Sequence, residues 1–140
     1  MAVAGGAIAA LSGGDAQAGG PLTAAESRGA AEAFARAYGA EDPRALARVL
    51  AVNVVRLGPG DVQRGRDAVV GEYRGQFANF AVRGYRLEDV EASGGSAGRV
   101  SARYSVERGA APAITGRIVF GVVRESGEAK IRLIAAEPRA

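Results

Sequence analysis

Carboxylates, arginines and tyrosines are the side chains that could carry chemistry in this chain. The 140 residues include no histidine and no cysteine. The usual general base near neutral pH is therefore missing, and so are thiolate nucleophiles and thiolate metal sites. Tryptophan is also absent, so aromatic contacts rest on four tyrosines and four phenylalanines. We expect neither a metal site nor a cofactor.

Two charged residues in predicted strands have alternative interpretations. Asp89 would be a lone acid if it pointed into a pocket, but its place beside Glu88 and Glu91 favours an exposed position. Arg56 would hold an anionic ligand if it faced inward, but we expect it to be exposed at a sheet edge. Tyr38 and Tyr73 lie on predicted inner helix stripes, where a tyrosine commonly packs in the core with its hydroxyl at the rim.

The charge of the chain does not predict nucleic-acid binding. There are 18 basic and 15 acidic residues, a formal net charge of +3, and Lys130 is the single lysine. The arginines are interleaved with acids and form no basic run, whereas a nucleic-acid binder gathers its charge on one face. The preference for arginine, alanine and glycine is typical of a GC-rich coding background.

The first 20 residues differ in composition from the rest, and we expect them to lie outside the fold. They are small, apolar and rich in glycine. The sequence Ala16-Gln17-Ala18 is similar to a signal cleavage site, but no basic residue precedes the apolar run Ala2–Leu11. That run is shorter than the roughly 20 residues that span a bilayer. An export signal, a membrane-anchor remnant and a flexible leader all remain open, and so does the cellular location.

Helix signals begin directly after this leader. Thr23-Ala24-Ala25-Glu26 is a capping box for a first helix that ends at Gly39. Asp42-Pro43 predicts the start of a short second helix. A third helix is expected over about 67–80, where Gly71 and Gly75 would allow close approach to the sheet or to a ligand.

The second half of the chain is predicted to be a sheet. Residues 99–108 alternate between apolar and polar side chains, as a half-exposed antiparallel strand does. The other expected strands cover 52–57, 84–92, 114–124 and 130–136. The fold class is therefore α+β, in one domain over residues 21–140.

Over Phe34–Tyr73 the expected order is helix, short helix, strand, turn and helix. The segment Gly65-Arg66-Asp67-Ala68-Val69 opens the last helix. This order resembles the nuclear transport factor 2-like superfamily and its SnoaL-like branch. The resemblance covers about Thr23–Glu137. It implies a cone: three N-terminal helices packed on a strongly curved, mostly antiparallel sheet, with a pocket at the open end. It also implies a homodimer formed through the outer sheet face, here the Val119–Val123 side.

The catalytic residues of two enzyme groups in this superfamily are not matched. In ketosteroid-isomerase-like members, the tyrosine, base and late acid fall on Phe34, Gly58 and Ile118 of this chain. In limonene-epoxide-hydrolase-like members, Arg103 matches the arginine of the relay, but Ser105 stands at the first aspartate. Both reactions need a carboxylate to move a proton, so neither is expected here.

We therefore expect a non-catalytic module that binds a small hydrophobic molecule in an apolar cone, mediates self-association, or does both. The alternative is a small-molecule isomerase, cyclase or epoxide hydrolase with an atypical site that lacks histidine. The residues expected to line the pocket are aromatic: Phe34, Tyr38, Tyr73, Phe77, Tyr104 and Phe120. A membrane tether remains open as a further partner.

Overall fold

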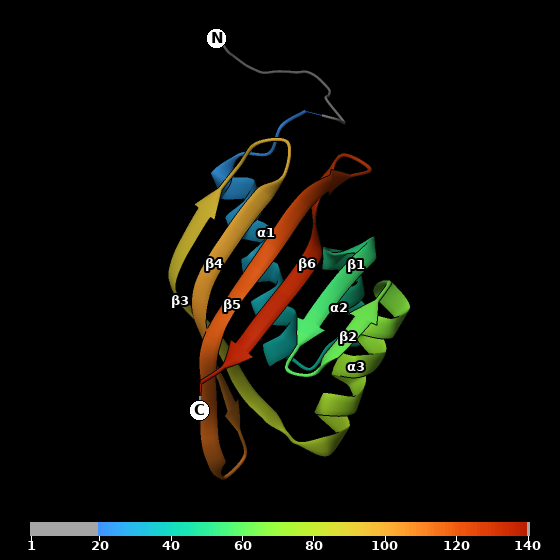
Figure 1. The fold of residues 1–140 in the computed structure, drawn as a ribbon. Helices are drawn as coiled ribbons and strands as arrows, with labels where there is room; N and C mark the ends of the chain where they lie inside the picture. The colour runs from blue at the N-terminus through green and yellow to red at the C-terminus, as the bar shows by residue number, and fades with distance from the viewer. Residues whose placement is uncertain (1–19, 140) are drawn as a thin grey trace.

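The computed structural model describes residues 20–139 as three helices and six strands (Figure 1). The helices are α1 (Ala24–Gly39), α2 (Pro43–Val49) and α3 (Arg66–Asn79). The strands are β1 (Leu50–Gly58), β2 (Asp61–Arg64), β3 (Val82–Ser93), β4 (Gly98–Arg108), β5 (Ala111–Glu125) and β6 (Glu128–Pro138). The expectations for the leader concern residues that lie almost entirely outside the described range. Within that range, no helix is both long enough and apolar enough to span a membrane.

The helix starts are those that the sequence predicts. The Thr23 hydroxyl accepts a hydrogen bond from the Glu26 amide at 3.0 Å, and the Glu26 carboxylate accepts one from the Thr23 amide at 2.9 Å. Asp42 caps α2 through two backbone amides at 3.1 Å each, and proline takes the first helical position. These bonds satisfy amide donors that have no partner inside the helix.

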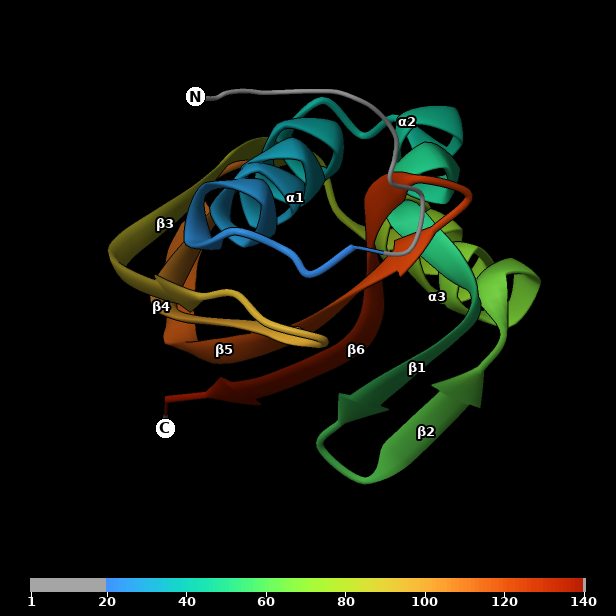
Figure 2. The same ribbon diagram turned by 90° about the horizontal axis from the view of Figure 1, so that it is seen from above.

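The six strands form one curved sheet in the order β2-β1-β6-β5-β4-β3. All neighbouring pairs are antiparallel except β1 and β6, which run parallel. Seen from above, the sheet curls around α1, while α2 and α3 lie toward the β1 side (Figure 2). Alternate residues of β4 are buried against the helices, as its sequence pattern predicts.

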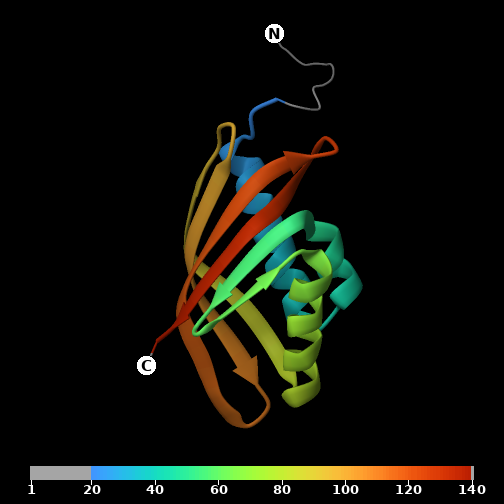
Figure 3. The same cartoon turned by 45° about the vertical axis from the view of Figure 1, so that its right-hand side comes forward.

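Strand β2 is absent from the sequence-based expectation, which has only a turn after the first strand. Its four residues pair with the end of β1 and place Gln63 opposite Arg56. The resulting hairpin lies alongside α3 (Figure 3). Because β2 covers one side of β1 and β6 covers the other, β1 is an interior strand and Arg56 is not at a sheet edge.

The expectation for the two glycines of α3 is wrong. A Cβ atom added to Gly71 or Gly75 would meet nothing within 4 Å, so neither glycine allows a close approach. Close approaches occur instead at Gly94 and Gly116, where a Cβ would overlap the carbonyl oxygens of Leu22 and Glu137. The first contact holds the entry to α1 against the β3–β4 turn, and the second lets the end of β6 pass close to β5.

Candidate functional site

A cavity of about 290 Å³ lies between the helices and the concave face of the sheet. It is at the end of the sheet where β1 and β6 stop and β4 turns into β5, the lower end in Figure 1. Its lining is mostly aromatic and aliphatic: Phe34, Tyr38, Arg56, Pro59, Tyr73, Gln76, Phe80, Tyr85, Tyr104, Val106, Ile114, Ile118, Ala136 and Pro138. We take this cone as the candidate site, because a few polar groups in an enclosed apolar lining are typical of small-molecule pockets.

Ring contacts hold the walls of the cone together. Phe34, 1% exposed, has its ring centre 5.1 to 6.1 Å from those of Tyr38, Tyr73, Tyr85 and Phe120. Most of these pairs are edge-to-face, a geometry that aromatic side chains favour. Phe34 is therefore the centre at which α1, α3 and the sheet meet.

The structure places four of the six predicted pocket residues in the cavity wall: Phe34, Tyr38, Tyr73 and Tyr104. The other two are not among its lining residues. Phe120 is fully buried behind Phe34, and Phe77 is half-buried against the ring of Tyr38, 5.1 Å between centres. Phe77 lies one turn beyond Tyr73 on α3, and its neighbour Gln76 lines the cavity in its place.

The expectation that Arg56 is exposed is wrong, because its side chain is buried and lines the cone. In β1, Val54 and Arg56 face inward while Val55 and Leu57 are the more exposed residues. Arg56 donates a hydrogen bond from Nη1 to Gln63 Oε1 at 2.8 Å. Its guanidinium carbon lies 5.5 Å from the centre of the Tyr73 ring. An inward arginine was the alternative that the sequence left open.

A short hydrogen-bond chain leads out of the cone. The Tyr38 hydroxyl donates to Gln76 Oε1 at 2.7 Å, and Gln76 Nε2 donates to Glu72 Oε2 at 3.0 Å. Sequence reasoning missed Gln76 and Tyr85. The spacing of Gln76 from Tyr73 on one helix and the alternation of Tyr85 with Leu87 were the available signals.

All four tyrosines of the chain line the cone, and burial raises the pKa of each. For Tyr38 the pKa rises to about 12, with the nearby positive charges of Arg56 and Arg108 opposing the rise. The phenols are therefore neutral at physiological pH. They can donate or accept hydrogen bonds there, but none is a phenolate base.

The two other residues singled out for chemistry are not in the cone. Asp89 is exposed, as expected, and its carboxylate accepts a hydrogen bond from Arg103 Nε at 2.8 Å. Arg103 is exposed as well and lies 3.5 Å from Glu88. Asp89 has a φ of 53° at an irregularity in the pairing of β3 with β4. Arg103, which matches the relay arginine of the epoxide hydrolases, therefore lies outside this cavity.

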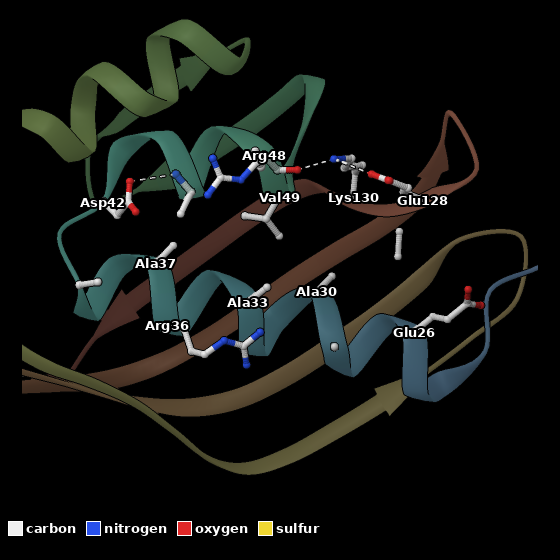
Figure 4. A pocket seen from close by; sticks show the side chains of 14 residues that line it. Glu26, Ala30, Ala33, Arg36, Ala37, Asp42, Arg48, Val49, Glu128 and Lys130 are labelled. Carbon is white, nitrogen blue, oxygen red and sulfur yellow. Dashed lines mark hydrogen bonds and ion pairs between the residues drawn. The ribbon is translucent and has the colours of Figure 1, made fainter.

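A larger hollow, about 630 Å³, is an open groove between α1, α2 and the β5–β6 hairpin. Figure 4 shows that its floor is made of small residues such as Ala30 and Ala33, with charged side chains toward its margins. Lys130 there contacts the Arg48 carbonyl oxygen and pairs with Glu128 at 3.1 Å. The groove contains none of the predicted site residues, so we place the site in the smaller cone.

No group of three or more His, Cys, Asp or Glu side chains within residues 20–139 is arranged to hold a metal ion. The cone itself is lined by neither a carboxylate nor an imidazole. Its chemical resources are six aromatic rings, the phenol hydroxyls, one amide and one guanidinium. Such a set can hold and orient a molecule.

Comparison with known proteins agrees with the resemblance and with the cone. A family model described as SnoaL-like domain matches residues 31–130. No curated protein matches the chain.

Solved structures with this fold include a candidate dehydratase of the NTF2-like family from Streptomyces avermitilis. It is 21% identical, has a TM-score of 0.72, and the match covers 82% of this chain and 95% of that one. A candidate aromatic ring hydroxylase from Novosphingobium aromaticivorans is 20% identical, with a TM-score of 0.70 and coverage of 83% and 88%. A ketosteroid isomerase-like protein from Erwinia carotovora atroseptica is 17% identical, with a TM-score of 0.70 and coverage of 84% and 96%. The predicted α+β cone is confirmed.

Proposed function

We propose that this chain, which belongs to the SnoaL-like domain family, binds a small hydrophobic molecule in its cone without converting it. The observation that supports this most is the lining: six aromatic rings with no carboxylate or imidazole among them. Rings give an apolar molecule contact area at low entropic cost, and the hydroxyls fix its orientation. A volume near 290 Å³ suits a ligand of one or two rings.

Proton transfer would need a base within hydrogen-bond reach of the reacting atom, about 3 Å away. Glu72 is the carboxylate connected to the cone, but the amide of Gln76 stands between it and Tyr38. An amide does not pass protons readily. The tyrosines are too weakly acidic for the task, since the pKa of Tyr38 is about 12.

An enzyme with an atypical site is the alternative. Two neighbours are described as a candidate dehydratase and a candidate hydroxylase, but their identities of 21% and 20% to this chain relate the folds alone. If an isomerase, cyclase or hydrolase assay gave turnover that Tyr38→Phe abolished, the enzyme would replace the binding module. Our proposal predicts no turnover with the wild type or with Tyr38→Phe.

The binding test uses the tyrosines as the probe. Because the chain has no tryptophan and all four tyrosines line the cone, intrinsic fluorescence reports on the site alone. Titration with neutral 2-naphthol should quench this emission in a saturable manner, and calorimetry should give the same affinity. If emission and heat both stayed flat up to the solubility limit of 2-naphthol, the binding function would be wrong.

We further propose that the outer face of the sheet pairs with a second copy of the chain. Two rows of neighbouring residues run across the strands there. One is Ser101, Val119, Ala135, Leu57 and Val62, and the other is Arg99, Gly121, Leu133, Val55 and Arg64. Their middle positions are apolar, and Leu57 and Val62 are 40% and 51% exposed. On the other face of β5, Ile118, Phe120 and Val122 are buried in the core.

Replacing Leu57 with arginine should therefore give a monomer, because it would place an unpaired charge in the middle of an apolar interface. Sedimentation at high micromolar concentration measures the change against a dimeric wild type. Val52→Arg is the matched control, since Val52 is 63% exposed and lies outside both rows. A monomeric wild type, or a dimer in Leu57→Arg, would refute this interface.

A further inference from the structure

The buried guanidinium of Arg56 is compensated only in part by the protein. The residue is 9% exposed, and burial of a charge is costly unless the charge is paired and hydrogen-bonded. Asp61 is its ion-pair partner, with 3.6 Å between Nη1 and Oδ1. The Asp61 side chain is 47% exposed, so water screens much of this attraction. The remaining contact at Nη1 is the neutral amide oxygen of Gln63.

Both contacts use the same nitrogen. Arg56 donates a hydrogen bond from Nη1 to Gln63 at 2.8 Å. A side-chain hydrogen bond between the Arg56 guanidinium and Tyr73 opposes the rise that burial causes in the pKa of that phenol. The two other guanidinium nitrogens are Nε and Nη2. Neither of these two nitrogens is among the fully buried side-chain atoms that lack a hydrogen-bond partner. They carry the parallel N–H groups that bind a carboxylate through two hydrogen bonds.

The rest of the cavity offers donors and positive potential, with no compensating carboxylate. The Tyr38 hydroxyl donates a hydrogen bond to Gln76, and Tyr73 interacts with the Arg56 guanidinium. The hydroxyls of Tyr85 and Tyr104 stay protonated, because burial raises the pKa of each. A second cation, Arg108, lies 5.0 Å from the centre of the Phe80 ring in the cavity wall. The cone is therefore complementary to a ligand that has rings at one end and an acceptor with negative charge at the other.

We infer that the ligand of the cone is a small aromatic carboxylate, whose ring packs among the tyrosines and whose carboxylate pairs with Arg56. This inference rests on the proposed binding function and narrows it to a ligand class. It also accounts for the cost of burying Arg56, because the ligand supplies the charge that the protein leaves out. Gly58 leaves room for the guanidinium and for Asp61, since a Cβ there would lie 2.8 Å from Arg56 Nη1 and closer still to Asp61 Oδ1.

The test compares 2-naphthoate with 2-naphthamide, two probes of nearly the same shape that differ in charge. The full-length protein should bind 2-naphthoate about 10- to 100-fold more tightly, the range expected for hydrogen bonds to a charged group. Arg56→Gln should remove this preference, because it should weaken 2-naphthoate binding far more than 2-naphthamide binding. Arg103→Gln, at an exposed arginine on β4, is the matched control and should keep the preference.

Equal binding of the two probes by the wild type would overturn the inference and leave the proposed binding function standing. Binding of neither probe would overturn both. A preference that survives in Arg56→Gln would show that another group holds the carboxylate. If Arg56→Gln failed to fold, Arg56→Lys would replace it: the charge remains but the paired N–H groups are lost, so the preference should fall without disappearing.

Discussion

Replacing Phe34 with alanine is expected to lower the free energy of unfolding by about 3–5 kcal/mol, as for other buried aromatic side chains. Phe34 is 1% exposed and contacts rings from α1, α3, β3 and β5. Its removal leaves a void between four different elements, so relaxation can recover little of the loss. Chemical denaturation with near-ultraviolet circular dichroism measures both the stability and the packing of the tyrosines.

Phe77→Ala is the matched control on α3. Its ring is half-buried and contacts Tyr38. Phe77→Ala therefore removes less buried apolar surface than Phe34→Ala does. We expect less than half the cost of Phe34→Ala. Equal costs for the two variants would contradict the placement of Phe34 at the centre of the core.

Alkaline pH is expected to destabilise the protein through its tyrosines. Burial raises the pKa of Tyr38 from 10.0 to about 12. Below pH 10 the folded and unfolded chains both keep this proton, so the stabilisation is fully present. Between pH 10 and pH 12 the unfolded chain releases the proton and the folded chain does not, so stability falls as pH rises. A shift of two units corresponds to about 3 kcal/mol, and the raised pKa values of Tyr73, Tyr85 and Tyr104 act in the same direction.

The test measures the free energy of unfolding below pH 10 and between pH 10 and pH 12. Tyrosinate absorbance is recorded at the same pH values. Tyr38→Phe should lose less stability than the wild type over the same interval, because one of the titrating groups is gone. Tyrosinate absorbance that rose near pH 10 for all four residues of the folded protein would contradict the buried cone.

The sequence predicted well those elements whose signals are local. The capping box at Thr23, the aspartate and proline that begin α2, and the alternation over residues 99–108 all depend on neighbours within a few positions. Phe34, Tyr38 and Tyr104 followed from the first and the last of these signals, and Tyr73 from the inner stripe of the third helix, since a helix stripe and a strand face each point in one direction.

The inward position of Arg56 could not be predicted because it depends on long-range pairing. Val55 and Leu57 are apolar, so the local pattern assigns them to the core and the arginine to solvent. In the structure the apolar side faces outward, toward the proposed dimer surface, and the bulge in β1 between Leu50 and Val55 shifts the register of the strand. A shift of one residue moves a side chain to the other face of a sheet.

Filling the cone tests most directly whether it is the binding site. Ala136 lines the cone from β6, and Ala33 lines the groove between α1 and α2. We expect Ala136→Phe to lose most of the 2-naphthol affinity of the wild type while it still unfolds cooperatively, and Ala33→Phe to bind as the wild type does. Unchanged binding in a folded Ala136→Phe, or loss of binding in Ala33→Phe, would show that the ligand does not occupy the cone.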